Sequence, residues 1–222
     1  MNNYSARSIR AFLDNFPSGA WLIFAVDLLH TIGFSIAFPF LALYLHDTRK
    51  LPMSVVGTLF LVAGLCTAGT NLVGGMLSDR LGRRRLFISV TSIGVVAYGG
   101  LALLIGVDAP LAVIFAVYIA ARSILGTINP TMLAIIADIT PRNRLAEIYA
   151  FVRTGGNVCF ALGPAIGGYM LTFLPFAWLL SISAFACAAV AILCFFLLKE
   201  SRVRGGEVVD IRSTLAVASD RP

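Results

Sequence analysis

The sequence predicts an all-α membrane protein whose chain crosses the bilayer six times. Three observations support this fold class: 59% of the 222 residues are hydrophobic, only 13% are charged, and the hydrophobic residues gather in six long runs. A water-soluble domain must cover its surface with polar groups, and this composition supplies too few of them. We therefore expect hydrocarbon around much of the surface.

Each run has the ~20 residues that a helix needs to cross the hydrocarbon core. The first run follows Arg7 and Arg10, but it is long enough to span and has no small-residue cleavage site, so we interpret it as a retained helix. Only Asp108-Ala109-Pro110 separates the third and fourth runs, and only Leu174-Pro175 the fifth and sixth, which predicts antiparallel neighbours. The expected spans are Ala20–Leu45, Ser54–Ser78, Leu86–Val107, Leu111–Ala137, Ile148–Phe173 and Phe176–Leu198.

The positions of the basic residues predict the orientation of these spans. Thirteen Lys and Arg residues lie in the two terminal segments and in the loops after the second and fourth spans, whereas the opposite side holds only Arg49 and Lys50. Cytoplasmic loops carry an excess of Lys and Arg, so we expect both termini in the cytoplasm of a multi-pass protein of the cell (inner) membrane. The formal net charge of +6 is then a sign of topology, and no nucleic acid partner is expected.

Weak internal symmetry relates the first three spans to the last three. Gly74-Gly75 in the second span matches Gly167-Gly168 in the fifth, and Pro39 in the first matches Pro130 in the fourth. Three helices followed by three of opposite topology form a 3+3 inverted repeat, which is common in secondary transporters. By composition, the three parts of the chain are a cytoplasmic N-terminal segment (1–19), a six-helix transmembrane bundle (20–204) and a polar cytoplasmic linker (205–222).

The most informative motif lies between the second and third spans: Gly75-Met76-Leu77-Ser78-Asp79-Arg80-Leu81-Gly82-Arg83-Arg84. Two helices that reverse direction within a few residues need Gly82 for a tight backbone turn. Asp79 can cap a helix start and hold an arginine. Arg83 can reach Asp138, at the end of the fourth span.

This pattern, G-x-x-x-D-R-x-G-R-R, resembles the loop between helices two and three of the major facilitator superfamily. The resemblance covers roughly residues 18–204, about half of a typical member. It implies the N-terminal six-helix half of that fold, completed by a C-terminal half or a second copy. It also implies a conformational latch that holds the two halves when the protein opens outward, formed by Gly75, Asp79, Arg80, Gly82, Arg83, Arg84 and Asp138.

A second motif lies in the fifth span. Gly163-Pro164-Ala165-Ile166-Gly167-Gly168 resembles the G-P-x-x-G-G element of the superfamily's drug–proton antiporters. Proline removes a backbone hydrogen bond and bends a helix, and glycines let a neighbouring helix approach closely. We therefore expect a helix-bend element here, with generic small-residue packing as the alternative; its residues are Gly163, Pro164, Gly167 and Gly168.

Ionisable residues inside apolar runs are costly and are usually functional. Arg122 lies well inside the fourth span, and Arg122-x-x-x-Gly126 resembles the superfamily's R-x-x-q-G element, with Leu125 in place of the polar residue. We expect Arg122 to face a wet cavity or an acid, and the best candidate for the acid is Asp27, which lies one helical turn from His30 on the same face. A carboxyl group balanced between burial and a cation can load and release a proton as water access changes. Asp27, His30 and Arg122 are therefore the candidate proton-coupling residues, with an interfacial acid as the alternative for Asp27.

Other residues in the spans are weaker candidates. Arg153 is expected to snorkel to the cytoplasm or to pair with Asp138 or Glu147. Aromatic and amide side chains can line a substrate cavity, although packing roles fit them equally; the expected cavity residues are Phe34, Asn129 and Asn157.

The sequence predicts neither an enzyme nor a cofactor or metal site. The four cysteines lie in apolar runs without ligand spacing, and neither a Walker loop nor a nucleophile elbow occurs. We expect the N-terminal half of a proton-coupled secondary transporter that exports small lipophilic or drug-like molecules by alternating access. The alternatives are a metabolite–proton symporter and a non-transporting half-length membrane module. The expected partners are a small-molecule substrate, protons, the lipid bilayer, and a C-terminal six-helix half or a second copy.

Overall fold

The computed structural model describes residues 18–198, and every regular element in this range is a helix. A π-helical turn (Tyr44–Thr48) extends the first helix, and a 3-10 turn (Arg142–Arg144) precedes the sixth. The helices are α2 (Ser18–Leu43), α3 (Met53–Leu81), α4 (Arg83–Gly106), α5 (Leu111–Leu125), α6 (Ile128–Ile139), α7 (Leu145–Leu171) and α8 (Phe176–Leu197). The predictions for residues 1–17 and 199–222, including Arg7, Arg10 and the linker, lie outside the described residues.

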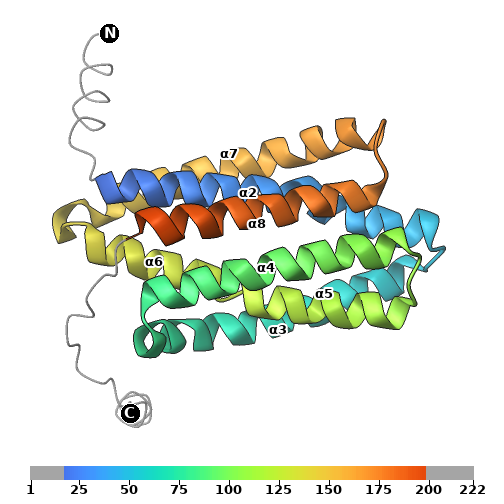
Figure 1. Ribbon diagram of the computed structural model, residues 1–222, viewed down its shortest axis with the longest axis horizontal. Coiled ribbons are helices and arrows are strands. Elements are labelled where there is room, and N and C mark those ends of the chain that lie inside the picture. The colour runs from blue at the N-terminus through green and yellow to red at the C-terminus, as the bar shows by residue number, and fades with distance from the viewer. Residues whose placement is uncertain (1–17, 199–222) are drawn as a thin grey trace, which may run out of the picture.

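The long helices lie along one another and alternate in direction, so the chain turns at the two ends of one bundle (Figure 1). One end carries the turns at Gly82 and Thr140, together with the start of α2 and the end of α8; we call it the signature end. The opposite end carries the turns near Lys50, Asp108 and Leu174. The short links that predicted antiparallel neighbours form two of these turns.

Local backbone chemistry explains where the helices stop. Gly82 alone separates α3 from α4 and has a φ of 88°, a conformation that residues with side chains rarely adopt. The tight turn predicted at Gly82 is therefore confirmed. Pro110 and Pro175 precede α5 and α8, where the missing backbone N–H leaves no helical bond unmade.

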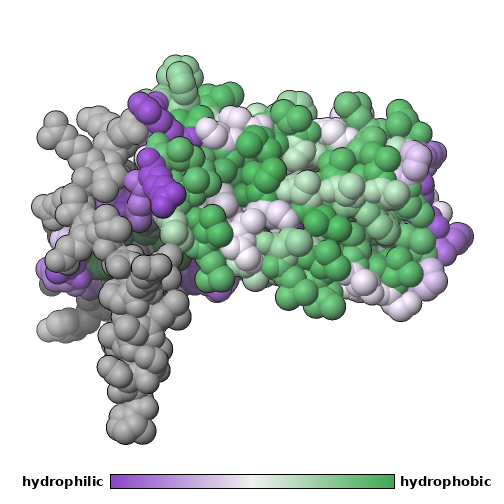
Figure 2. Space-filling model, turned by 90° about the horizontal axis from the view of Figure 1, so that it is seen from below, coloured by the Kyte–Doolittle hydropathy of each residue, from purple (hydrophilic) through white to green (hydrophobic). Residues whose placement is uncertain are grey.

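Within residues 18–198, five helical stretches are long and apolar enough to cross a membrane. Figure 2 shows the corresponding surface: apolar side chains cover the middle of the bundle and hydrophilic side chains gather at its ends. The chain is therefore an all-helical, multi-pass membrane protein. The five stretches are Gly19–Thr48, Met53–Leu81, Arg83–Gly106, Leu111–Ile139 and Phe176–Leu197.

The predicted fifth span differs from these five stretches. It forms the long helix α7, which contains Arg153, Asn157 and several glycines and is not among the stretches apolar enough to cross a membrane. Its crossing of the membrane, and with it the count of six spans, stays a prediction.

The predicted fourth span is one run in the sequence but two helices in the structure. α5 ends at Leu125 and α6 begins at Ile128. Pro130 explains the break, because in a continuous helix its ring would clash with the carbonyl group of Gly126, four residues earlier. Gly126 also packs tightly on α3, since a Cβ there would lie 2.7 Å from Thr70 Oγ1. The sequence analysis missed this discontinuity.

The helix contacts form a symmetric set. α2 packs along α7 and α8, α3 packs along α5 and α6, and α4 packs along α5 and α8. If α2 is exchanged with α5–α6, α3 with α7 and α4 with α8, each helix contact in this set is replaced by another contact of the same set. A 3+3 repeat would produce such a pattern.

Glycines bring α7 onto α2. A Cβ at Gly163 would overlap Ser35, and a Cβ at Gly167 would overlap the carbonyl group of Ile36. Ser35 Oγ donates a hydrogen bond to the carbonyl oxygen of Cys159 at 3.2 Å. These contacts lie in the half of the bundle away from the signature end, and Gly155 and Gly156 keep α7 equally close to Phe24 and Asp27 nearer that end.

Candidate functional site

A cavity of about 560 Å³ lies among α2, α3, α5, α6 and α7. All three candidate proton-coupling residues and all three expected cavity residues line it: Asp27, His30, Phe34, Arg122, Asn129 and Asn157. The structure therefore brings together six residues that the sequence distributes over four elements. Their chemical roles stay predictions.

The α2 wall of the cavity follows from helical spacing. Asp27, His30 and Phe34 are separated by three and four residues, so they fall on one helix face. Asp27 is only 8% exposed, and a Cβ at Gly156 of α7 would lie 2.8 Å from its Oδ2. A glycine at position 156 therefore leaves room for a carboxylate between two packed helices.

The charged neighbour of Asp27 is Arg153 of α7, and the Thr31 side chain is the hydrogen-bonding neighbour of this carboxylate. This arrangement corrects the prediction for the partner of Arg153. Arg153 does not pair with Asp138 or Glu147, because the close approach of α7 to α2 brings it to Asp27. Arg153 is itself a cavity residue, which the sequence analysis did not predict.

Arg122 lies in the last turn of α5, beside the break before α6. Its Cζ is 4.6 Å from the ring centroid of Phe34 and 5.9 Å from that of Phe38. The guanidinium group therefore lies against aromatic faces, where a cation is attracted to the negative face of the ring. Thr67 Oγ1 of α3 donates a hydrogen bond to the Arg122 carbonyl oxygen at 3.1 Å and holds this last turn in place.

The predicted pairing of Arg122 with Asp27 is wrong for this structure. Among residues 18–198, no carboxylate oxygen lies within 4.0 Å of the Arg122 guanidinium, whose polar neighbour is the Tyr98 side chain. Helical periodicity places both residues in the cavity. It does not indicate that α5 turns Arg122 toward the aromatic part of α2.

Four further polar residues of the cavity were not among the sequence predictions: Thr31, Thr67, Asn71 and Tyr149. The side-chain oxygen of Asn71 is buried and has no hydrogen-bond partner among the described residues. An amide inside an apolar run is the signal that could have identified it. Tyr149 gives no comparable signal, because tyrosines are common near membrane interfaces.

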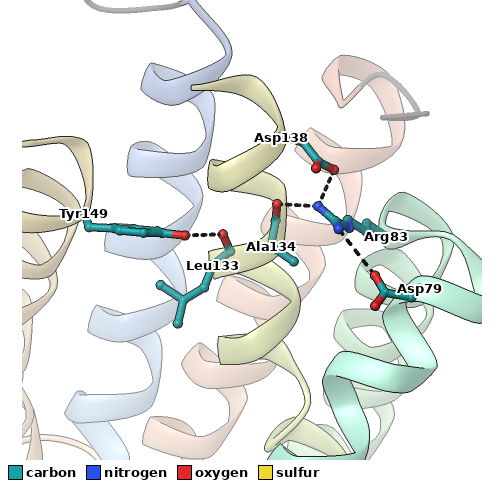
Figure 3. A network of polar contacts seen from close by, with 6 residues as sticks. All are labelled: Asp79, Arg83, Leu133, Ala134, Asp138 and Tyr149. Atoms are coloured by element: carbon teal, nitrogen blue, oxygen red, sulfur yellow. Dashed lines mark hydrogen bonds and ion pairs between the residues drawn. The ribbon is translucent and has the colours of Figure 1, made fainter. Parts of the chain in front are cut away.

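The second functional candidate is the network at the signature end (Figure 3). Arg83 of α4 forms an ion pair with Asp138 of α6 and a second one with Asp79 of α3, with 3.3 Å between Nη2 and Oδ1. Arg83 Nη1 also donates to the Ala134 carbonyl oxygen at 2.6 Å. The contacts predicted for Asp79, Arg83 and Asp138 are therefore confirmed, and one guanidinium joins three helices.

Tyr149 contacts α6 from the other side. Its hydroxyl group donates to the Leu133 carbonyl oxygen at 2.9 Å, next to the carbonyl of Ala134 that Arg83 binds (Figure 3). Consecutive carbonyls of α6 are thus bound from α7 and from α4. Tyr149 also lines the cavity, and so do several residues of α6. The cavity and the network therefore share Tyr149 and the helix α6.

The other residues of the expected latch differ from one another. Arg84 Nε and Nη2 donate to the carbonyl oxygens of Leu198 and Phe195, both at 2.6 Å, so Arg84 caps the end of α8. Arg80 is exposed and has no hydrogen bond or ion pair with another described residue. Gly75 faces open space, where a Cβ would meet nothing within 4 Å.

Three of the helix-bend residues contact α2. Gly163 and Gly167 are the close-approach positions described above, and a Cβ at Gly168 would lie 3.4 Å from the Phe40 ring. Pro164 lies inside the continuous helix α7. The packing role of these glycines is visible, and a bend at Pro164 stays a prediction.

Comparison with known proteins identifies similar sequences. The model of the Major Facilitator Superfamily matches residues 23–218. A Na(+), Li(+), K(+)/H(+) antiporter of Planococcus maritimus is 26% identical over 74% of this chain and 38% of its own length. The quinolone resistance protein NorA of Staphylococcus aureus is 28% identical over 72% of this chain and 42% of its own length. The chain therefore spans less than half the length of these relatives.

Proposed function

Because the chain belongs to the Major Facilitator Superfamily, we propose that it is the N-terminal half of a proton-coupled secondary transporter. In this proposal the complete transporter exports small lipophilic or drug-like molecules by alternating access. Members of this family are transporters rather than enzymes, and two similar proteins are named as an ion–proton antiporter and a quinolone resistance protein.

One observation carries the proposal: Asp27, His30 and Arg122 line a single cavity inside helices that are apolar enough to cross a membrane. Ionisable residues at membrane depth are expensive and mark substrate and ion pathways. The break between α5 and α6 lies at the same cavity. Discontinuous helices at the centre of the bundle are a feature of transporter binding sites.

The proposed proton carrier is Asp27. It is nearly buried, which favours the neutral carboxyl group, and Arg153 is its charged neighbour, which favours the carboxylate. Opening the cavity to one side or the other would change both the distance from Asp27 to Arg153 and the access of water to Asp27. Proton uptake at Asp27 is then linked to release of the substrate, which gives exchange of the two.

The six-helix count and the 3+3 repeat belong to the proposal. The symmetric helix contacts support the repeat, with α7 as the sixth spanning helix. Both α3 and α7 expose large apolar side chains, among them Leu65 and Leu72 on α3 and Phe160 and Leu162 on α7. We assign these surfaces to a C-terminal six-helix half or to a second copy, which would close the cavity from the open side.

The excess of basic residues supports an orientation with both termini in the cytoplasm. The signature end would then be the cytoplasmic end. The network of Asp79, Arg83 and Asp138 would hold this end closed while the cavity opens outward.

The experiment is flux in proteoliposomes that contain the chain together with its second half. With a pH gradient imposed, a lipophilic fluorescent dye should move against the proton flow. Asp27→Asn should abolish pH-driven movement, because the amide cannot exchange a proton at neutral pH. Asp108→Asn is the matched control, since it removes a carboxylate outside the cavity and should keep full flux.

Three results would contradict the proposal. Full proton-driven flux by Asp27→Asn would remove this residue from the mechanism. Dye and protons that move in the same direction would favour the symporter, and no flux from the assembled protein would favour the non-transporting module.

A further inference from the structure

The charges in the cavity are unevenly paired. Asp27 of α2 and Arg153 of α7 both line the cavity, and Arg153 is the cation whose charge acts on Asp27. Arg122, in the last turn of α5, lies against the rings of Phe34 and Phe38 and near the side chains of Tyr98, Tyr118 and His30, and no carboxylate of residues 18–198 lies within 4.0 Å of its guanidinium. One carboxylate, Asp27, and two guanidinium groups, Arg122 and Arg153, line the cavity, so it holds one surplus positive charge when Asp27 is ionised, and Arg122 is the cation without an acidic neighbour.

A guanidinium at this depth is costly without an anion. Contact with Phe34 and Phe38 offsets part of the lost hydration, but a charge-assisted pair with a carboxylate or a similar acid is stronger, and a planar guanidinium can bind it through two parallel hydrogen bonds. Arg122 and the two amides Asn71 and Asn129 all line the cavity. The buried side-chain oxygen of Asn71 also lacks a hydrogen-bond partner among the described residues.

Part of the apolar lining of the cavity is aromatic, beside aliphatic side chains such as Met132 and Ile136. Phe34 and Phe160 are nearly parallel, with ring centroids 6.5 Å apart and an interplanar angle of 26°. Phe38 lies next to Phe34, with 4.7 Å between their ring centroids. Arg122 lies directly against this aromatic wall.

We propose that the cavity selects a molecule that carries an acidic group on a flat aromatic body. The acid pairs with Arg122 and the ring system lies on Phe34 and Phe160, while Asn71 and Asn129 offer amide contacts to further polar groups. This inference rests on the proposed function, because it names the substrate class of the same cavity. The competing source of the anion is an acidic side chain of a second half, and the experiment below separates the two.

The experiment compares two probes of nearly identical shape. 2-Naphthoate carries a carboxylate, and 2-naphthamide replaces it with a neutral amide. Binding of both to the purified full chain in a neutral detergent is measured by equilibrium dialysis against protein-free micelles, and then repeated for the chain assembled with its second half. We expect naphthoate to bind at least about tenfold more tightly than naphthamide in both preparations.

Two variants assign this preference to Arg122. Arg122→Gln should remove the preference for the anion while leaving naphthamide binding within about twofold of wild type. Arg122→Lys keeps the charge and should retain most of the preference, which guards against a folding defect in the glutamine variant. Arg49→Gln, which removes a positive charge at the opposite end of the bundle, should change neither affinity.

Each of the other outcomes contradicts a stated part of the inference or of the proposed function. Equal affinities for the two probes in both preparations reject the acidic substrate and leave the proposed transporter intact. A preference in the chain alone that disappears on assembly assigns the anion to the second half and also rejects the acidic substrate. No binding of either probe to either preparation rejects this inference and removes the cavity as the substrate site of the proposed function.

Discussion

Each end of the bundle holds an arginine of the same exposure, but the carboxylates that pair with them differ. Arg83 at the signature end and Arg49 at the opposite end both have side chains that are 16% exposed. Asp138, the partner of Arg83, is 24% exposed, whereas Asp108, the partner of Arg49, is 82% exposed. Each arginine also donates to one backbone carbonyl, that of Ala134 or Ala109.

This difference indicates different tasks for the two ends. An exposed carboxylate such as Asp108 is screened by water and contributes little, whereas the less exposed Asp138 is screened less, and without it Arg83 would keep only the exposed carboxylate of Asp79. Arg83 also joins α3, α4 and α6, while Arg49 connects two loops. At the signature end, Arg83 thus connects three helices, whereas the ion pair of Arg49 at the opposite end is weaker.

The largest expected effect follows from Asp138→Asn. We expect it to lower the free energy of unfolding by about 3 kcal/mol, because Arg83 would lose its less exposed carboxylate. The measurement is denaturant unfolding of the purified chain in detergent. A loss of less than about 1 kcal/mol would show that the pair is as weak as a surface ion pair.

Arg84→Gln should have an intermediate effect. The variant removes two donors from the carbonyl groups of Phe195 and Leu198, each bound at 2.6 Å, and should cost about 2 kcal/mol. Hydrogen exchange should also become faster in the last turn of α8. Arg80→Gln is the control, because Arg80 has no hydrogen bond or ion pair with a described residue, and equal losses in the two variants would argue against a cap.

Asp108→Asn should have the smallest effect, below about 1 kcal/mol, because its carboxylate is exposed. Asn tolerates the φ of 52° found at this position, so the substitution tests the charge alone. The same unfolding assay at low and high salt should give a loss that salt removes. A loss as large as that of Asp138→Asn would abolish the distinction between the two ends.

The sequence predicted the helices and the signature network well for identifiable reasons. Long apolar runs fix the helices to within a few residues, as Phe176–Leu198 became Phe176–Leu197. Asp79 and Arg83 are four residues apart across one glycine turn, so their contact depends on local geometry. Asp138 needed only the assumption that both loops lie at the same end.

The sequence predicted which residues line the cavity, but it did not predict which side chains are neighbours within it. Asp27 and Arg122 lie on helices whose rotation depends on close packing, and that packing turned Asp27 toward Arg153 and Arg122 toward Phe34. The break before α6 was also missed, because Pro130 was considered only as a symmetry mark. Such features depend on helix contacts, which one sequence without its neighbours does not specify.

The most direct test of the central claim is proton release from the assembled transporter on ligand binding. Saturating neutral 2-naphthamide is added in weakly buffered detergent solution, and a pH indicator records the protons set free. If substrate and proton compete through Asp27, wild type should release up to about one proton per bound molecule and Asp27→Asn none. Binding without any pH change in wild type, or equal release by Asp27→Asn, would contradict the account.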